Sequence, residues 1–218
     1  MRHDRKAVSR RTSIKLLGGA LAAMAFCGAR TARAAGPAAP WWTPTPAMDA
    51  MTAIRTRRSI RAYTDQDVTD AQVRELLGAA MAAPSAGNEQ PWQFIVIRDK
   101  ATLKQAGAIN EYVRYAVDAP VAILVCGDMR EDKYGGYWIE DVSAATQNML
   151  LAAHAMGLGA VWTGIYPLKE RIGAFRALMG APEHIVPMCL VVIGHPKETV
   201  PPIDRYQENR VHAERWKA

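Results

Sequence analysis

The sequence predicts a single α/β domain in which helices cover a central sheet, and two observations lead to this prediction. Three continuous apolar runs, at residues 92–98, 121–127 and 186–194, have the composition of buried strands. Segments with helical periodicity lie between them, and the longest covers residues 141–156. Such alternation is typical of layered α/β folds, and 218 residues, half of them apolar, can bury one core.

The first predicted elements follow a proline-rich linker at residues 35–47. A helix comes next and ends at a cluster of arginines; its apolar side chains fall on one face: Met48, Met51 and Ile54. A second helix begins after Thr69, because Thr69 and Gln72 fit a capping box and Val68 and Val73 fit a hydrophobic staple. The domain is therefore expected to span residues 48–218.

Glycine residues mark the ends of the later predicted helices. The long helix at residues 141–156 is apolar nearly all round, so we expect it to be buried, and Gly157 ends it. Residues 159–165 predict a short strand or turn. A last helix finishes at Gly180.

Residues 1–34 have the order of features found in a signal peptide. Arg10 and Arg11 precede a short apolar run at residues 16–26, and Ala32 and Ala34 give an A-x-A cleavage site. The run is too short to span a bilayer comfortably, so no stable membrane anchor is expected. The segment resembles a twin-arginine signal, which implies export of a folded protein, for example to the periplasm. The alternative interpretation is a basic disordered arm.

The net charge of +6 suggests nucleic-acid or membrane binding only at first sight. Eight Lys and Arg and one Asp lie in the first 35 residues, which leaves 19 basic and 20 acidic side chains in residues 36–218. The body is therefore close to neutral, and no nucleic-acid partner is expected. No His or Cys spacing predicts a metal site, and Cys126 and Cys189 lie in apolar runs, as buried cysteines usually do.

Four arginines stand within seven positions: Arg55, Arg57, Arg58 and Arg61. They fit either a solvated charge run at a helix C-terminus or a site for an anion. Two other segments favour the anion site. Residues 82–97 form a loop of small and amide residues that leads into a strand, and residues 157–167 are punctuated by glycine, so both let a planar ligand approach the backbone.

Four stretches occur in the order typical of one known family: "RRSIRAY", "APSAGNEQPWQFIVI", "DVSAATQNMLLAAHAMGLGAVWTGIYP" and "IGHPKETVPPIDRYQENRVH". In these stretches, which cover most of residues 50–212, the sequence resembles the FMN-dependent nitroreductases. The resemblance implies an α+β fold with a central, mainly antiparallel sheet flanked by helices. It also implies an intertwined homodimer, in which the tail after Gly194 embraces the partner.

The resemblance implies roles for individual residues in binding FMN. Arg57 and Arg61 match positions that hold the phosphate and ribityl chain, Arg58 and Ser59 match positions that contact the same region, and Arg205 matches a residue that closes on the phosphate. A loop would cover the flavin bound mainly by the partner subunit: Pro84, Ser85, Ala86 and Asn88. A second segment would follow the flavin edge: Trp162, Thr163 and Gly164.

The chemistry that the resemblance implies is two-electron reduction of a small aromatic or conjugated acceptor, with no catalytic acid or base in the protein. Four aromatic residues could either stack on that acceptor or be ordinary surface and core aromatics: Tyr112, Tyr134, Tyr137 and Trp138. The electron donor would be NAD(P)H or, because an exported protein meets little of either nucleotide, another redox protein or small carrier. The alternative function is an exported flavin carrier or sensor without turnover.

Overall fold

The computed structural model describes residues 48–216. The predicted signal peptide at residues 1–34 and the proline-rich linker at residues 35–47 lie outside the described residues.

Four strands form one sheet in the order β1-β2-β4-β3. Their bounds are Trp92–Ile97 for β1, Val121–Asp128 for β2, Gly159–Gly164 for β3 and Ile185–Gly194 for β4. Every neighbouring pair in this sheet is antiparallel. The mainly antiparallel sheet implied by the resemblance is confirmed, and the segment at residues 159–165 is a strand.

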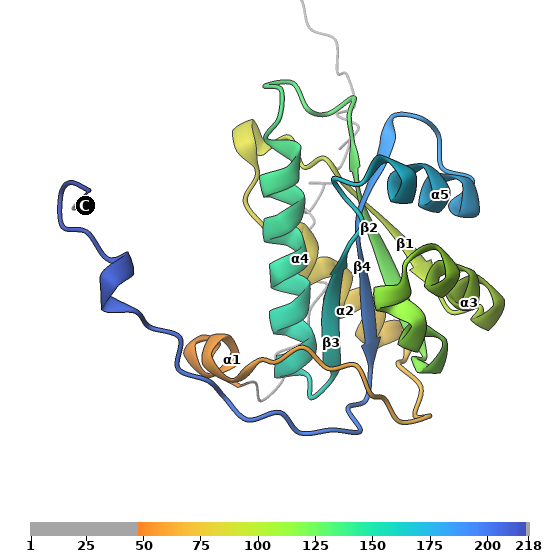
Figure 1. Cartoon of the computed structure of the whole chain (residues 1–218), viewed down its shortest axis with the longest axis horizontal. Helices are drawn as coiled ribbons and strands as arrows, with labels where there is room; N and C mark the ends of the chain where they lie inside the picture. The colour runs from red at the N-terminus through yellow and green to blue at the C-terminus, as the bar shows by residue number, and fades with distance from the viewer. Residues whose placement is uncertain (1–47, 217–218) are drawn as a thin grey trace, which may run out of the picture. The chain divides into compact units, whose positions relative to one another are not determined.

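Helices cover both faces of the sheet (Figure 1). One face carries α2 (Asp70–Met81) and α4 (Trp138–Ala155), and the short helix α1 (Ala50–Thr56) contacts α4. The other face carries α3 (Lys100–Ile109), the 3₁₀ segment η2 (Glu111–Asp118) and α5 (Lys169–Met179). The fold is therefore a sheet flanked by helices, as predicted.

The central strands are apolar throughout because each of their faces lies in a core. In β2, Ile123 belongs to the core under α2 and α4, whereas its neighbour Leu124 belongs to the core under α3 and α5. All eight residues of β2 are buried. A strand covered on both sides needs no polar alternation, which explains the continuous apolar runs in the sequence.

Local sequence signals account for several helix boundaries. The capping box is present at the start of α2: the Gln72 N–H donates to the Thr69 hydroxyl at 3.2 Å, and the Thr69 N–H donates to Gln72 Oε1 at 2.9 Å. The long helix begins at Trp138, three residues before the predicted start, and Gly157 follows its end with φ of 75°. The helical region from Lys100 to Asp118 was not predicted.

One predicted apolar face does not enter the core. Met51 and Ile54 on α1 are 52% and 54% exposed, and Met81 at the end of α2 is 51% exposed. The apolar pattern of α1 is real, but within residues 48–216 these side chains stay exposed.

The segment after α1, residues 57–63, is attached to the outer edge of β3 at Ser59 and Ile60 and then pairs with the chain that follows β4. Ser59 forms a parallel bridge with Ala160, and the Ile60 N–H donates to the Ala160 carbonyl at 3.2 Å. Ile60 and Tyr63 are buried. The Tyr63 hydroxyl contacts the Ile60 carbonyl at 2.5 Å and the Val192 carbonyl at 3.1 Å. We call residues 57–63 the arginine segment; its buried residues fix it on the sheet and leave its arginines outside.

Two glycines make room for these buried anchors. A Cβ atom on Gly159 would lie 2.7 Å from Cγ2 of Ile60, and one on Gly194 would lie 2.8 Å from the Tyr63 ring. Both distances are shorter than real contacts. The absence of a side chain at these positions therefore allows the arginine segment to approach the sheet.

Replacing Gly159 by Ala is expected to lower the free energy of unfolding by about 1–3 kcal/mol, because the added methyl displaces Ile60. Chemical denaturation measures the change. Gly173→Ala on α5 is the control, since open space surrounds Gly173 and the helix should gain up to ~1 kcal/mol. Equal stability of Gly159→Ala and the natural protein would contradict the described packing.

Candidate functional site

A cavity of about 720 Å³ lies at the start of the arginine segment. Arg57, Arg58 and Ser59 line it on one side, and residues 202–206, including Arg205, line it on the other. Four arginines and a single acidic residue, Asp204, border this cavity. The structure thus brings together four of the predicted phosphate-site residues from segments almost 150 positions apart.

The C-terminal segment is held beside the arginine segment by hydrogen bonds. The N–H groups of Arg61 and Ala62 donate to Glu198 Oε1 at 2.8 and 3.3 Å, and the Lys197 N–H donates to the Ala62 carbonyl at 2.9 Å. Arg58 Nε donates to the Pro201 carbonyl at 2.9 Å. These contacts bring the chain to the point from which Arg205 borders the cavity.

The cations at this cavity carry unused hydrogen-bonding capacity. Burial, together with the nearby charges of Arg58 and Arg205, lowers the pKa of Arg57. Within residues 48–216, the Arg57 guanidinium makes no hydrogen bond, and the buried Nη2 of Arg58 has no acceptor. Arginines held close together with free donors suit an anion with several oxygens, such as a phosphate ester.

A second cavity, of about 700 Å³, lies at the other end of the arginine segment. Arg61 and Trp162 both line this cavity. Thr163 and Gly164 line it as well. Arg61 is therefore separated from Arg57, and it belongs with the residues predicted for the flavin edge.

Residues from η2 complete the second cavity. The hydroxyl oxygens of Tyr115 and Thr163 lie 3.0 Å apart in a hydrogen bond. Asn110, which is buried, donates from Nδ2 to the Gly164 carbonyl at 3.3 Å. The Arg171 guanidinium carbon lies 5.6 Å from the centre of the Tyr112 ring. Aromatic faces with hydrogen-bonding groups and two arginines suit a planar, polar ring.

The predicted covering loop borders neither cavity: Pro84, Ser85, Ala86 and Asn88. The Ala86 N–H donates to Asp141 Oδ1 at 2.9 Å, at the start of α4. The arginine segment lies near the other end of α4, where Thr56 contacts His154 at 2.8 Å. Asp141 and His154 are 13 residues apart on one helix, so roughly 20 Å separates the loop from the phosphate cavity.

The four aromatic residues considered for substrate stacking are not together. Tyr112 lines the second cavity. Tyr134 lies against Gly87 in the covering loop, Trp138 is buried and meets Tyr166 edge-on at 5.1 Å, and Tyr137 is exposed just before α4. Of these four, only Tyr112 borders a cavity that the predicted site residues share.

Several residues that line these cavities or hold the backbone beside them carry no motif in the sequence: Asn110, Tyr115, Arg171 and Glu198. Asn110 caps the 3₁₀ segment η2, in which Tyr115 lies, and neither residue belongs to a motif that predicts a ligand site. Glu198 accepts hydrogen bonds from the backbone N–H groups of Arg61 and Ala62, more than 130 positions away, and no local sequence pattern predicts such a contact.

The described residues contain no group of three or more His, Cys, Asp and Glu side chains placed to hold a metal ion. No helix among residues 48–216 is long and apolar enough to cross a membrane. Cys126 and Cys189 are buried, and burial raises the pKa of the Cys126 thiol to about 12.

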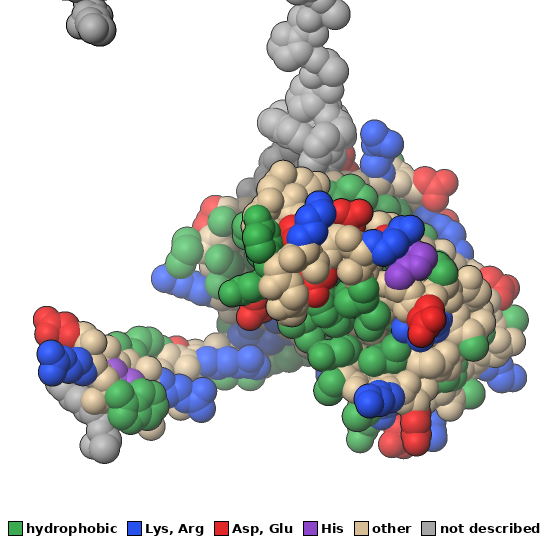
Figure 2. Space-filling view, turned by 90° about the horizontal axis from the view of Figure 1, so that it is seen from above, with side chains coloured by type: hydrophobic (Ala, Val, Ile, Leu, Met, Phe, Trp, Pro, Cys, Tyr) green, Lys and Arg blue, Asp and Glu red, His purple; other side chains and the backbone are tan. Residues whose placement is uncertain are grey.

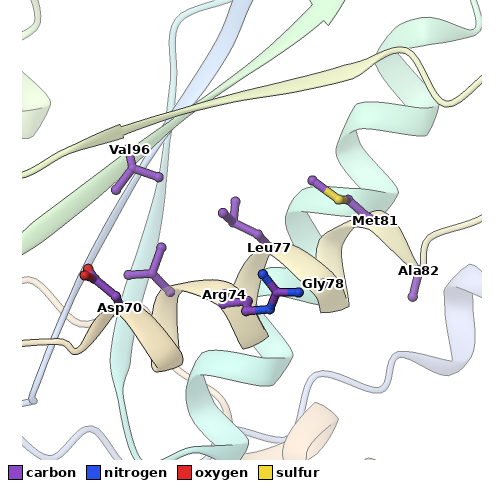
Figure 3. A pocket seen from close by; sticks show the side chains of 8 residues that line it. Asp70, Arg74, Leu77, Gly78, Met81, Ala82 and Val96 are labelled. Atoms are coloured by element: carbon purple, nitrogen blue, oxygen red, sulfur yellow. The ribbon is translucent and has the colours of Figure 1, made fainter. Parts of the chain in front are cut away.

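A third cavity, of about 630 Å³, lies between α2 and the edge strand β1 (Figure 3). Leu77 and Met81 from α2 and Val96 from β1 give it an apolar floor, and Asp70 and Arg74 border it. It shares no residue with the other two cavities. We call it the α2–β1 groove.

Comparison with known proteins shows what this arrangement is similar to. The model of the nitroreductase family matches residues 54–125 and 111–195. A protein of Methanothermobacter thermautotrophicus with the provisional name NADH dehydrogenase/NAD(P)H nitroreductase is 46% identical over 169 residues, which cover 78% of this chain and 88% of the relative. An archaeal protein with the same provisional name, from Archaeoglobus fulgidus, is 46% identical over 167 residues, 75% of this chain and 96% of its own.

A solved structure supports the same assignment. The crystal structure of a provisionally named nitroreductase from Desulfovibrio desulfuricans in complex with FMN is 36% identical, with a TM-score of 0.66, and the match covers 80% of this chain and all of the other. Since the family match covers most of the chain and the relatives match over nearly their full length, the chain belongs to the nitroreductase family.

Proposed function

We propose that the protein is an FMN-dependent oxidoreductase that reduces a small aromatic or conjugated acceptor. One observation carries the proposal: partly buried and exposed arginines with unused donors gather around one cavity, and a second cavity lined by aromatic and polar groups borders the same segment. A phosphate joined to a planar ring system by a flexible chain fits this pair of cavities. The FMN present in the related solved structure is such a molecule.

The residues present fit FMN in the following way. Arg57 and Arg205 would hold the phosphate, with Ser59 offering its hydroxyl beside them. The ribityl chain would follow the arginine segment to Arg61, and the ring would lie against Trp162 and Thr163. Arg58 is already committed in part to the carbonyls of Pro201 and Arg57, so its main contribution is to shape the cavity.

Bound FMN would supply the redox chemistry, accepting two electrons from a reduced donor and passing them to the acceptor. The protein would orient the ring and limit the access of water. The Tyr115–Thr163 hydrogen bond and the Asn110–Gly164 hydrogen bond hold the wall of the ring cavity. The electron donor has two candidates. The name of a relative refers to NAD(P)H and favours a nicotinamide nucleotide, whereas export would favour another redox protein or a small carrier.

A flavin carrier or sensor without turnover is the alternative. Saturable reduction of a nitroaromatic acceptor, with NADH, NADPH or an artificial reductant in turn, separates the two functions. A carrier would reduce the acceptor slowly and in proportion to its concentration.

We further propose that the protein is a homodimer in which each subunit covers the other's flavin. Three features support this. The covering loop lies too far from the phosphate cavity of its own chain to contact an FMN molecule bound there. The apolar face of α1 is exposed. Residues 201–211 are exposed throughout, and Figure 2 shows this end of the chain standing apart, with cationic and hydrophobic side chains side by side.

The α2–β1 groove is the place we propose for the partner's tail. The groove is apolar and lies beside β1, whose outer edge is not paired within the described residues. An edge strand with unpaired N–H and C=O groups favours the addition of an extended segment. The tail carries exposed apolar side chains that could fill the groove: Ile203, Tyr206, Val211 and Trp216.

Export through the twin-arginine route also remains our proposal, and it rests on the sequence of residues 1–34 alone. The route carries folded proteins, which suits a cofactor inserted before export. Arg10→Lys and Arg11→Lys together should retain the protein in the cytoplasm, as measured by cell fractionation, and unchanged export would refute this route.

Replacing Arg57 and Arg205 together by Ala is expected to weaken FMN binding by about 100-fold or more. Each lost charge-assisted hydrogen bond removes roughly 1.5–3 kcal/mol. Quenching of flavin fluorescence measures the dissociation constant. The control Lys104→Ala removes an exposed charge from the other face of the sheet and should leave the affinity within about twofold, because exposed and distant charges are screened. Undiminished FMN binding by the Arg57/Arg205 variant would refute the assigned phosphate site.

Ending the chain after Pro202 is expected to shift the protein from dimer to monomer, because the tail that fills the groove is lost. Light scattering after size-exclusion chromatography measures the mass. Leu77→Glu in the groove should have the same effect, and Ala177→Glu on the exposed face of α5 should not. A dimer that survives both the truncation and Leu77→Glu would show that the tail does not hold the subunits together.

A further inference from the structure

His154 lies beside the phosphate cavity without lining it. It stands in the last turn of α4, half-buried, and its Nε2 lies 2.8 Å from the hydroxyl oxygen of Thr56. Thr56 is the last residue of α1 and directly precedes Arg57. No motif in the sequence marks this histidine.

The contacts of Thr56 determine which nitrogen of His154 carries hydrogen. The Thr56 hydroxyl oxygen also lies 2.7 Å from the Thr52 carbonyl oxygen. A carbonyl oxygen can only accept, and two oxygens this close repel each other unless a proton lies between them, so the single hydroxyl proton points to Thr52. Thr56 therefore accepts from Nε2–H of His154. The nitrogen that can gain or lose a proton is then Nδ1.

The surroundings of His154 disfavour its charged form in the absence of a ligand. Burial, followed by the charges of Arg57 and Arg58, lowers the pKa of His154. The charged side chains of α2, the other helix packed against α4, are not among the groups that shift this pKa: Asp70, Arg74 and Glu75. Burial and two of the arginines that border the cavity thus both disfavour the charged imidazole.

We propose that His154 is a proton-linked positioning residue, which takes up a proton at Nδ1 when the phosphate group of FMN binds among Arg57, Arg58 and Arg205. The inference rests on the proposed function. A bound phosphate neutralises the arginines that now repel a charged imidazole and adds a negative charge nearby. The protonated imidazole then adds to the positive field around the phosphate and stays fixed to Thr56 through Nε2.

The direction of the pH dependence follows from linkage. Binding raises the pKa of His154, so the contribution of His154 to affinity is complete below the pKa of the free protein and disappears as the pH rises through the pKa of the complex. A rise of one pKa unit corresponds to tenfold tighter binding at low pH. The phosphate of FMN itself titrates near pH 6. The natural protein and a variant that lacks the histidine are therefore compared with the same ligand, so that titration of the phosphate affects both equally.

The experiment compares the full-length mature protein with His154→Gln, in which the amide can still donate to Thr56 but cannot titrate. Dissociation constants for FMN and for riboflavin, which has no phosphate, are measured at pH 5.5 and pH 8.0. His184→Gln is the control, since His184 lies at the opposite end of β4 from Gly194, roughly 30 Å from the arginine segment. In parallel, the NMR signal of the His154 ring gives its pKa in the natural protein before and after FMN is added.

We expect His154→Gln to weaken FMN binding about threefold to tenfold at pH 5.5 and less than twofold at pH 8.0, with riboflavin unaffected at both, as linkage to one added charge predicts. We also expect the NMR-derived pKa of His154 to rise when FMN binds. An equal effect at the two pH values, or a pKa that stays the same or falls, would overturn the inference while FMN binding itself stands. Failure of the natural protein to bind FMN at either pH would overturn both the inference and the proposed function.

Discussion

The attachment of the arginine segment to the outer edge of β3 is the constraint on which the site depends. Ile60 and Tyr63 enter the core, Ser59 bridges to Ala160, and the Tyr63 hydroxyl donates to the Val192 carbonyl, so the segment is held against the sheet. This placement puts Arg57 at one cavity and Arg61 at the other. A side chain at position 159 would collide with Ile60, so the segment can approach the sheet only because this residue is glycine. Packing in the core therefore determines the spacing of the charged groups that would contact a ligand.

The electrostatics of the site favour a ligand of opposite charge. Arg57 is partly buried beside Arg58 and Arg205, and its lowered pKa reflects both the burial and the repulsion. Such an arrangement destabilises the empty protein, and a phosphate group that accepts several hydrogen bonds would remove the repulsion. His154, which contacts Thr56, lies near the same arginines, and burial together with the charges of Arg57 and Arg58 lowers its pKa. Binding energy and proton uptake would then have a common origin.

Much of the fold could be predicted from local sequence. The capping box at Thr69, the glycine after α4 and the apolar runs that became strands are encoded within a few residues. The antiparallel order of the strands followed only from the resemblance, because strand pairing depends on contacts between distant segments. The division of the predicted site between two cavities could not be seen in sequence, since Arg57 and Arg61 are only four positions apart. The helical region from Lys100 to Asp118 was missed although Asp99 caps its start and its first helix is amphipathic, so the local signals for it were present in the sequence.

The most direct test of the account is the affinity of the mature protein for FMN compared with riboflavin, measured together with the number of flavins bound per chain. The account predicts close to one FMN per chain, and riboflavin bound at least about 100-fold more weakly, because the arginines act on the phosphate. Equal affinity for the two flavins would contradict the role given to the arginine segment, and a protein that binds neither would contradict the proposed function as a whole.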